Sequence, residues 1–316
     1  MKLSLVIPCY NEEKNIEPFM KCCIETFGNN KNIEYIFIND GSKDNTFLEI
    51  KKIIEKYKNE NILGISFSRN FGKEAAMLAG LKKSKGKFTA LIDADLQQNP
   101  KYVKQMLEYI EGHGEYDCVT CYQEKRKEGK LLTWLKERFY SLINKISDVE
   151  FYKNASDFRL FNRKVLNSIL DMKEYYRFSK GLFSYIGYNT YYMPYEVNER
   201  MYGKSSWSLF GLFKYALNGI IGFSVAPLKL ATILGLITMI LSLIYLIVII
   251  IKKIFIGIAV SGYPTIICLI LIFGGLQMFL LGVIGEYLGR TYIETKKRPV
   301  YIIKGEITKR KENIND

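Results

Sequence analysis

Short apolar runs alternate with longer amphipathic stretches along the N-terminal part of the chain. Five short segments, most of them apolar, are predicted as strands: Leu3–Ile7, Tyr35–Ile38, Ile62–Phe67, Phe88–Ile92 and Asp117–Thr120. Four stretches between them predict helices: Glu13–Phe27, Thr46–Tyr57, Gly72–Lys82 and Lys101–Glu111. Strands that alternate with helices through short connections form βαβ units. The pattern therefore predicts an α/β fold, with a mostly parallel, Rossmann-like sheet and helices on both faces.

Two long runs without charge follow in the C-terminal third, Leu230–Ile251 and Ile254–Gly285. A helix needs about 20 apolar residues to cross the hydrocarbon core of a bilayer. We therefore predict transmembrane helices near Ala231–Ile251 and Thr265–Gly285, separated by a turn at Gly262–Pro264. The alternative is a pair of buried helices in a soluble protein, which two such runs in succession disfavour.

The chain is basic as well as apolar: its 316 residues include 45 Lys and Arg against 32 Asp and Glu, a net charge of +13. Such an excess needs an anionic neighbour, which is nucleic acid, a phosphate-rich substrate or a lipid surface. The turn between the spans has only Lys252 and Lys253, whereas eight basic residues follow the second span: Arg290, Lys296, Lys297, Arg298, Lys304, Lys309, Arg310 and Lys311. The positive-inside rule then places both termini and the large N-terminal part in the cytosol, at the inner (cytoplasmic) membrane. Nucleic-acid binding is not expected, because the basic residues gather beside the spans.

Two segments between the sheet and the spans have helical character. Trp134–Ile146 is amphipathic, and Ser205–Pro227 mixes aromatic and apolar residues directly before the first span. The second composition favours a helix in the membrane interface over a helix packed on the domain surface. The predicted organisation is a cytosolic α/β domain at residues 1–204, interfacial helices at 205–228, a two-helix transmembrane hairpin at 229–289 and a basic cytosolic tail at 290–316.

The sharpest chemical motif is Asp93-Ala94-Asp95, directly after the fourth apolar run. Two carboxylates two residues apart at the end of a strand can face one hard cation. Mg²⁺ is bound in proteins by one or two carboxylates together with substrate phosphates. The motif therefore predicts a Mg²⁺ or Mn²⁺ site at Asp93 and Asp95, although the same triplet also occurs by chance in surface loops.

Polar turns also follow the first two strands, at Pro8–Glu12 and Asn39–Ser42. Together they offer an aromatic ring, carboxylates and a glycine turn, which suit a nucleobase and a ribose; either turn alone would be an ordinary strand–helix connection. No dinucleotide fingerprint GxGxxG is present. Gly203-Lys204-Ser205 is not a P-loop either, because position 198, where its upstream glycine would stand, is Asn.

Eight motifs occur in a fixed order: VIPCYNEE, INDGSKDNT, SRNFGKEAAMLAGL, DADLQQNP, SDFRLFNRKV, RMYGKSSWSLF, FSVAPLKL and GEYLGRTYIETKKRP. In this order they resemble the family 2, GT-A-fold polyprenyl-phosphate glycosyltransferases. The resemblance is greatest to bactoprenol (undecaprenyl-phosphate) glucosyltransferases and extends more distantly to dolichol-phosphate mannosyltransferases. It spans nearly the whole chain, including both predicted spans.

The resemblance implies metal-dependent, inverting transfer of one hexose from a nucleotide sugar, first of all UDP-glucose, to undecaprenyl or another polyprenyl phosphate. Another sugar (GlcNAc, mannose or aminoarabinose) would fit the same motifs. A processive polysaccharide synthase is disfavoured because the motif Q-x-x-R-W is absent. A non-catalytic scaffold is disfavoured by the intact DADLQ. A homo-oligomer, specifically a tetramer, is also implied only by the resemblance.

The resemblance also implies roles for single residues. Contacts to the nucleotide sugar would come from Pro8, Tyr10, Glu12, Ile38, Asp40, Lys73, Asp93, Ala94, Gln97 and Lys204. Asp40 would contact the base, and Gln97 would support the metal ligands Asp93 and Asp95. Catalytic residues would be Asp157, Asp95, Arg126 and Arg200, with the two arginines facing the sugar phosphate or the lipid phosphate.

Two positions depart from the family pattern. Asn39 stands where Asp is common, and Ser206 stands where the motif R-x-x-G-x-S-K has its lysine, with Lys204 two residues before it. The acceptor implied by the resemblance, a lipid monophosphate, is already an anionic nucleophile, so stabilisation of the leaving diphosphate should matter more than a strong base. We therefore interpret Asp157 first as an organiser of Arg159 or of sugar hydroxyls and second as a base. The alternative is a capping Asp paired with a neighbouring Arg.

Overall fold

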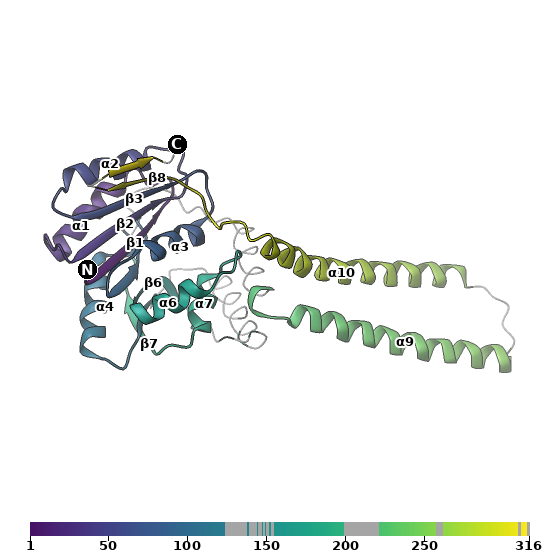
Figure 1. Ribbon diagram of the computed structural model, residues 1–316. Helices are drawn as coiled ribbons and strands as arrows, with labels where there is room; N and C mark the ends of the chain where they lie inside the picture. The colour runs from purple at the N-terminus through teal and green to yellow at the C-terminus, as the bar shows by residue number, and fades with distance from the viewer. Residues whose placement is uncertain are drawn as a thin grey trace.

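A computed structural model describes residues 1–123, 138, 144, 147, 149, 152, 155–198, 221–256, 262–308 and 311–314. It has two parts, an α/β domain and a pair of long helices that project from one side of it (Figure 1). The predicted amphipathic helix at 134–146 and the predicted interfacial helix at 205–227 fall largely outside the described residues.

The domain is built on one sheet with strand order β7-β5-β6-β4-β1-β2-β3-β8-β9. Its described strands are β1 (Leu3–Cys9), β2 (Ile33–Asn39), β3 (Asn61–Phe67), β4 (Phe88–Leu91), β5 (Cys118–Gln123), β6 (Ala155–Asn162), β7 (Thr190–Tyr195), β8 (Ile303–Thr308) and β9 (Lys311–Ile314). The central strands β4, β1, β2 and β3 are parallel, as predicted, and β5 pairs parallel with β7. Strand β6 runs antiparallel to both of its neighbours, so the sheet is more mixed than the sequence pattern predicted.

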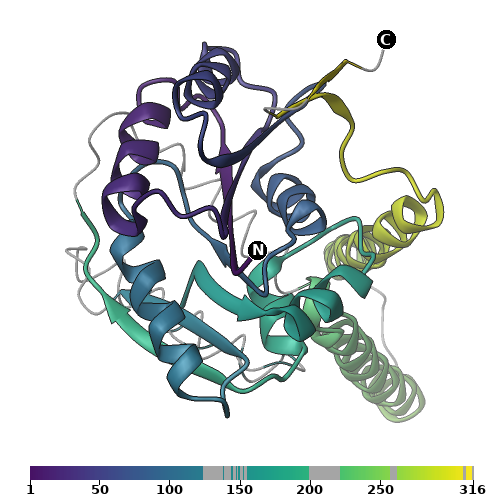
Figure 2. The ribbon, with the colours of Figure 1, turned by 60° about the vertical axis from the view of Figure 1, so that its left-hand side comes forward.

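Helices cover both faces of the sheet (Figure 2). Their bounds are α1 (Ile16–Phe27), α2 (Thr46–Lys56), α3 (Lys73–Lys83), α4 (Pro100–Gly112), α6 (Arg163–Asp171) and α7 (Ser179–Tyr185). Side chains of α1, α2 and α4 pack with Leu5 and Ile7 of β1, whereas α3, α6 and α7 pack on the other face with Val6. A Cβ on Gly80 would lie 2.3 Å from Val6 Cγ1, so α3 sits on β1 at a distance that only glycine permits. The predicted two-faced α/β arrangement is confirmed.

The projecting helices are α9 (Ala226–Ile256) and α10 (Tyr263–Thr295), which lie side by side (Figure 1). Their segments Ala226–Lys252 and Thr265–Thr295 are long and apolar enough to cross a membrane. In the most apolar stretch of each, no residue is buried against the rest of the protein. Large apolar side chains stand exposed along both, such as Leu241 at 59% and Met278 at 73%. A soluble protein rarely exposes so much contiguous apolar surface, so the hairpin has the composition of a lipid-facing element.

The chain returns from α10 to the domain. Residues 303–308, which the sequence pattern left in a basic tail, form β8, and β8 pairs antiparallel with β3 at the sheet (Figure 2). Tyr301 stacks on Phe67 with ring centroids 5.0 Å apart, and Lys83 pairs with Glu306 at 2.6 Å. Strands β6 and β7 were not predicted as strands either. The segment after the second span is thus part of the α/β domain and not only a charged extension.

Candidate active site

The carboxyl ends of β1, β2 and β4 meet at one edge of the sheet, because the three strands are parallel and adjacent. Ligands of open α/β sheets bind at this edge. Strand β6 pairs antiparallel with β4, with Leu91 opposite Arg159, so the beginning of β6 lies at the same edge. Asp157 therefore comes close to Asp93 although 64 residues separate them along the chain (157 − 93).

Asp40, after β2, is the most enclosed polar group of the predicted nucleotide side, with 3% of its surface exposed. Its carboxylate accepts hydrogen bonds from the backbone N–H groups of Phe71 at 2.7 Å and Gly72 at 2.9 Å. Burial raises the pKa of Asp40, although these two hydrogen bonds oppose the shift. Gly41 has a φ of +60°, and a Cβ there would lie 2.2 Å from the carbonyl carbon of Arg69. Asp40 and Gly41 together hold the loop at 69–72 against the end of β2.

Asn39, the departure from the family pattern, also has a structural use. Its amide donates to Ser66 Oγ at 3.0 Å and accepts from the N–H of Ser42 at 3.1 Å. The side chain thereby joins the ends of β2 and β3 and closes the turn after Asp40. An ionised Asp at this position could not donate the first of these bonds.

The turns after β1 and β2 are bonded to each other. Asn11, at a φ of +56°, accepts from the N–H of Lys43 and donates its own N–H to Ser42 Oγ. The N–H of Glu12 donates to Thr46 Oγ1 at 2.8 Å. Beside them, Tyr10 is 41% exposed and available to a ligand, as its predicted role requires. This pair of turns forms a rigid rim next to Asp40.

Ile38 and Ala94 were predicted to contact the nucleotide sugar, and both have buried side chains. Ile38 packs in the core cluster beneath α3, and Ala94 packs in the cluster on the other face of the sheet. Any contact from either residue to a ligand therefore has to come from its backbone.

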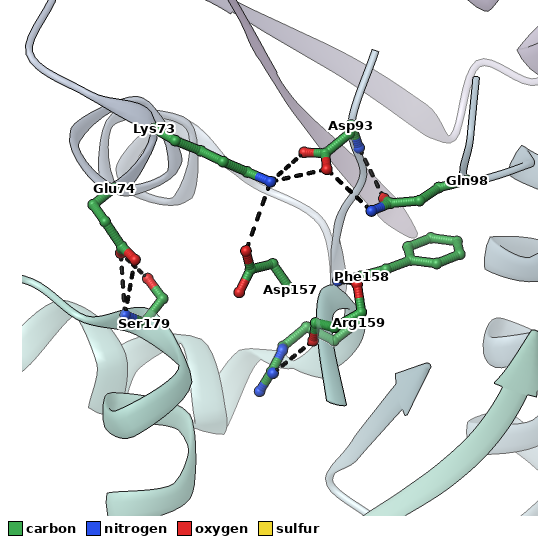
Figure 3. A network of polar contacts seen from close by, with 9 residues as sticks. Lys73, Glu74, Asp93, Gln98, Asp157, Phe158, Arg159 and Ser179 are labelled. Carbon is green, nitrogen blue, oxygen red and sulfur yellow. Dashed lines mark hydrogen bonds and ion pairs between the residues drawn. The ribbon is translucent and has the colours of Figure 1, made fainter. Parts of the chain in front are cut away.

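Lys73, the first residue of α3, joins the two halves of the site (Figure 3). Its Nζ lies 2.6 Å from Asp93 Oδ1, 2.9 Å from Asp93 Oδ2 and 3.6 Å from Asp157 Oδ2. Burial lowers the pKa of Lys73, but the charges of Asp93 and Asp157 outweigh it and raise the pKa above its usual range. In turn, burial raises the pKa of Asp157, and the charges of Lys73, Lys180 and Arg159 outweigh it, so the net pKa is lowered. Lys73 and Asp157 are therefore both ionised at neutral pH.

Gln98, which is not among the predicted site residues, forms two hydrogen bonds with Asp93. Gln98 Oε1 accepts from the N–H of Asp93 at 2.9 Å, and its Nε2 donates to Asp93 Oδ2 at 3.1 Å (Figure 3). Asp95 is nearly buried, and its Oδ1 accepts from the N–H of Gln97 at 3.2 Å. Between them, Leu96 adopts a φ of +60°, which turns the loop sharply. The supporting amide side chain on Asp93 is therefore that of Gln98, whereas Gln97 contributes its backbone N–H to Asp95.

The residues present fit a divalent cation. Among the residues that the structure describes, no group of three or more His, Cys, Asp or Glu side chains could hold a metal by itself. Mg²⁺ and Mn²⁺ do not need one, because one or two carboxylates suffice when substrate phosphates complete the coordination. Asp93 and Asp95 supply two carboxylates on one short loop, and Asp93 already attracts the ammonium of Lys73. The donor set suits a hard cation that arrives with a phosphorylated substrate.

The second carboxylate oxygen of Asp157 takes no part in the contact with Lys73. Asp157 Oδ1 is buried without a hydrogen-bond partner among the described residues. Arg159, two residues on, stacks over the ring of Phe183 at 3.8 Å and donates to the carbonyl of Ser156 at 2.9 Å. Lys73 is thus the ion-pair partner of Asp157, and Arg159 contributes only a smaller electrostatic effect on it.

A single small cavity is lined by five of these residues: Pro8, Lys73, Asp93, Gln98 and Asp157. The structure therefore brings together four of the predicted site residues, Pro8, Lys73, Asp93 and Asp157, and places Gln98 beside them. Three predicted residues, Arg126, Arg200 and Lys204, lie outside the described residues.

The comparisons with known proteins show the family of the chain. Residues 4–170 match glycosyl transferase family 2, and residues 226–291 match the GtrB C-terminal hairpin. The chain belongs to glycosyl transferase family 2, and it is a glycosyltransferase with a GT-A-like sheet followed by two apolar helices. The resemblance seen in the motifs is confirmed.

Several relatives match over nearly the full length of the chain, including the following three. An uncharacterized glycosyltransferase, sll0501, of Synechocystis sp. is 41% identical over 96% of this chain and 95% of its own length. The prophage bactoprenol glucosyl transferase homolog of Escherichia coli (strain K12) is 41% identical over 96% of this chain and 99% of its own. The bactoprenol glucosyl transferase of Shigella phage SfV is 39% identical over 97% of this chain and 99% of its own.

Proposed function

We propose that the protein transfers a single glucose from UDP-glucose to undecaprenyl (bactoprenol) phosphate at a membrane surface, with inversion at the anomeric carbon. The observation that carries the proposal is the cluster of Lys73 with Asp93 and Asp157, at the ligand edge of a family 2 domain that is joined to a membrane-type hairpin. The names of two relatives that match over nearly their full length, a bactoprenol glucosyl transferase and a prophage bactoprenol glucosyl transferase homolog, support this acceptor and this sugar.

In this proposal the nucleotide binds on the β1–β2 side. Tyr10 and the enclosed Asp40 receive the uridine, and the loop at 69–72 is kept in place by the Asp40 carboxylate. Asp93 and Asp95 would hold Mg²⁺ or Mn²⁺, which would supply positive charge to the leaving diphosphate when bound. Lys73 adds a second positive charge at the same place, since its ammonium already lies on Asp93. Charge stabilisation of this kind is usually the largest catalytic term.

The acceptor then occupies the Asp157 side. A lipid monophosphate is an anion at neutral pH and needs no proton removed before it attacks the anomeric carbon in line. The lowered pKa of Asp157 makes its carboxylate a weak base, which favours the organising role over the basic role. Asp157 Oδ1, which has no partner among the described residues, is suited to accept a hydrogen bond from a sugar hydroxyl. Arg126, Arg200 and Lys204 remain predicted contacts to the phosphates.

We further propose that α9 and α10 cross the inner (cytoplasmic) membrane and that both termini and the domain are cytosolic. The support is the apolar hairpin together with the basic residues after it, which the positive-inside rule assigns to the cytosol. The acceptor phosphate would then be taken from the cytosolic leaflet, and the product would serve as a lipid-linked donor for modification of a cell-surface glycan. The proposed homo-oligomer, a tetramer, rests on the family resemblance alone.

The test is incubation of the purified protein in lipid nanodiscs with Mg²⁺ or Mn²⁺, undecaprenyl phosphate and a panel of radiolabelled nucleotide sugars. The expected result is an extractable lipid-linked sugar, formed fastest from UDP-glucose. A faster reaction with UDP-GlcNAc, GDP-mannose or an aminoarabinose donor would support the proposed reaction but show that the transferred sugar is not glucose. No lipid-linked product from any donor would refute the proposal.

A further inference from the structure

The short segment before and within α7 is held by two carboxylates that come from different parts of the molecule. Near the end of α10, Glu294 Oε1 accepts from the backbone N–H groups of Tyr175 at 2.8 Å and Tyr176 at 3.4 Å. From α3, both carboxylate oxygens of Glu74 accept from the N–H of Ser179 at 3.1 Å, and one of them also accepts from its hydroxyl (Figure 3). One five-residue segment is therefore bonded to the membrane hairpin at one end and to the active-site helix at the other.

The membrane hairpin touches α7 a second time, at the residues that lead into α9. A Cβ on Gly181 would lie 2.3 Å from the ring of Phe223, so α7 and Phe223 are in the closest contact that glycine allows. Phe178 and Phe223 pack with ring centroids 6.0 Å apart. The hydroxyl of Tyr287 in α10 donates to the carbonyl of Ser224 at 2.7 Å, which ties this segment to the second helix. Both helices of the hairpin are thus linked to residues 175–181.

The other side of α7 faces the reaction centre. Phe183 lies under the guanidinium of Arg159 at 3.8 Å, and the charge of Lys180 contributes to the lowered pKa of Asp157. Glu74 is the direct neighbour of Lys73, so its contact with Ser179 fixes the helix end from which Lys73 reaches Asp93 and Asp157. A displacement of α7 would change the surroundings of Asp157, Arg159 and Lys73 together.

We propose that the segment Tyr175–Phe183 fixes the position of the acceptor side of the site, around Asp157, with respect to the membrane hairpin. Glu294 and Glu74 are the two positioning residues that hold this segment. The proposal rests on the proposed function in one respect, that the acceptor is a phosphate attached to the membrane. Such a phosphate arrives at a fixed height above the bilayer, so the domain has to be held at a matching position. A water-soluble acceptor reaches the site without that alignment.

The test compares Glu294→Ala with a matched control, Thr295→Ala. Thr295 is the next residue of α10, and its hydroxyl donates only to the carbonyl of Tyr292 in the same helix. Kinetics are measured in nanodiscs with undecaprenyl phosphate and in solution with a short, water-soluble prenyl phosphate. We expect Glu294→Ala to lose about tenfold or more in kcat/KM with the long acceptor and to stay within about twofold with the short one, since small misplacements are costly only where alignment is needed. Thr295→Ala should behave as the unsubstituted protein with both acceptors.

The proposal would be overturned if Glu294→Ala lost kcat/KM equally with both acceptors, or lost none with either. A second measurement does not depend on turnover: hydrogen exchange of residues 175–183 in nanodiscs should be faster in Glu294→Ala than in Thr295→Ala, and equal exchange would contradict the proposed link. If the unsubstituted protein forms no lipid-linked product, the proposed function fails, while the exchange experiment still decides whether Glu294 holds this segment. Binding of UDP, measured by calorimetry, confirms that each variant is folded.

Glu74 is tested by a conservative and a non-conservative change. The amide of Glu74→Gln can still accept from Ser179, whereas Glu74→Ala cannot. We expect Glu74→Ala to lower kcat by about tenfold or more with both acceptors and Glu74→Gln to restore most of it, because geometry and not charge is what the contact supplies. Equal damage in the two variants would show that the charge of Glu74 matters and would overturn its positioning role.

Discussion

The ammonium of Lys73 lies 2.6 Å from the carboxylate of Asp93 and 3.6 Å from that of Asp157, so one cation joins the predicted metal-binding motif after β4 to the beginning of β6. The two carboxylates serve different ligands in the proposed reaction, the donor diphosphate and the acceptor side. The ammonium of Lys73 is the positive charge that interacts with the carboxylates of both sides. Its contacts would rearrange when a metal and a diphosphate arrive at Asp93, which frees its ammonium for the phosphates.

Replacement of Lys73 by Gln should remove a positive charge from the departing diphosphate. We expect kcat/KM to fall by about two to three orders of magnitude, the usual effect of losing one preorganised charge or donor at a developing anion. Lys101→Gln, in the first turn of α4, is the matched control and should keep its activity. A Lys73→Gln variant within a few-fold of the unsubstituted protein would exclude Lys73 from the reaction.

The same change should alter the pH dependence. The charge of Lys73 is the largest influence that lowers the pKa of Asp157, and burial acts in the opposite direction. A carboxyl with a lowered pKa stays ionised until the pH falls below the ordinary Asp value of about 3.9, and without Lys73 burial should raise that pKa. The residual activity of Lys73→Gln should therefore decline at a higher pH on the acid side than that of the unsubstituted protein. If activity declined at the same acidic pH in Lys73→Gln and in the unsubstituted protein, ionisation of Asp157 would not control activity.

Loss of the Asp40 carboxylate should weaken nucleotide binding. Asp40→Ala removes the acceptor for the N–H groups of Phe71 and Gly72, and hydrogen bonds to a charged group contribute about 1.5–3 kcal/mol each. We expect the Kd for UDP, measured by calorimetry, to rise by about tenfold or more. Asp171→Ala, at the exposed end of α6, should leave the Kd unchanged. A normal Kd in Asp40→Ala would place the nucleotide elsewhere.

The return of the chain to the sheet should contribute to the stability of the domain. Tyr301 stacks on Phe67, which also packs edge-on against Phe71 of the loop that Asp40 holds. Tyr301→Ala should lower the free energy of unfolding by about 1–2 kcal/mol, from the lost aromatic pair and part of its buried area. The measurement is thermal unfolding in detergent, with Tyr185→Ala, an exposed tyrosine, as the control. Equal melting temperatures for the two variants would mean that the C-terminal segment does not stabilise the domain.

The parts of the fold that depend on local pattern could be predicted from the sequence. The central parallel strands and the first four helices follow from apolar periodicity, and the hairpin follows from two runs without charge. Strand β8 was missed because its apolar residues, Ile303 and Ile307, are few and stand among charges, and only the pairing with β3 makes them a strand. Strand β6 was seen as a motif but not as a strand, since its partner β4 is distant in the chain.

The identities of several candidate site residues could be predicted from the sequence, but the contacts between them could not. Asp93, Asp95, Asp157 and Lys73 were all predicted, yet the ion pair of Lys73 with Asp157 depends on the antiparallel pairing of β4 with β6. Gln98 was missed because Gln97 and Gln98 cannot be told apart by residue type, and only the structure shows that Gln98 donates to Asp93. Glu74 was missed because its partner Ser179 lies 105 residues further along the chain.

The central claim is the transfer of glucose to a membrane-bound polyprenyl phosphate. The most direct measurement is the amount of radiolabelled glucose that moves from UDP-glucose to undecaprenyl phosphate in nanodiscs with Mn²⁺ or Mg²⁺, for the unsubstituted protein and for Asp95→Asn. We predict that the unsubstituted protein forms a lipid-linked glucose and that Asp95→Asn, while still folded, forms almost none. No transfer by the unsubstituted protein, or full transfer by Asp95→Asn, would contradict the account.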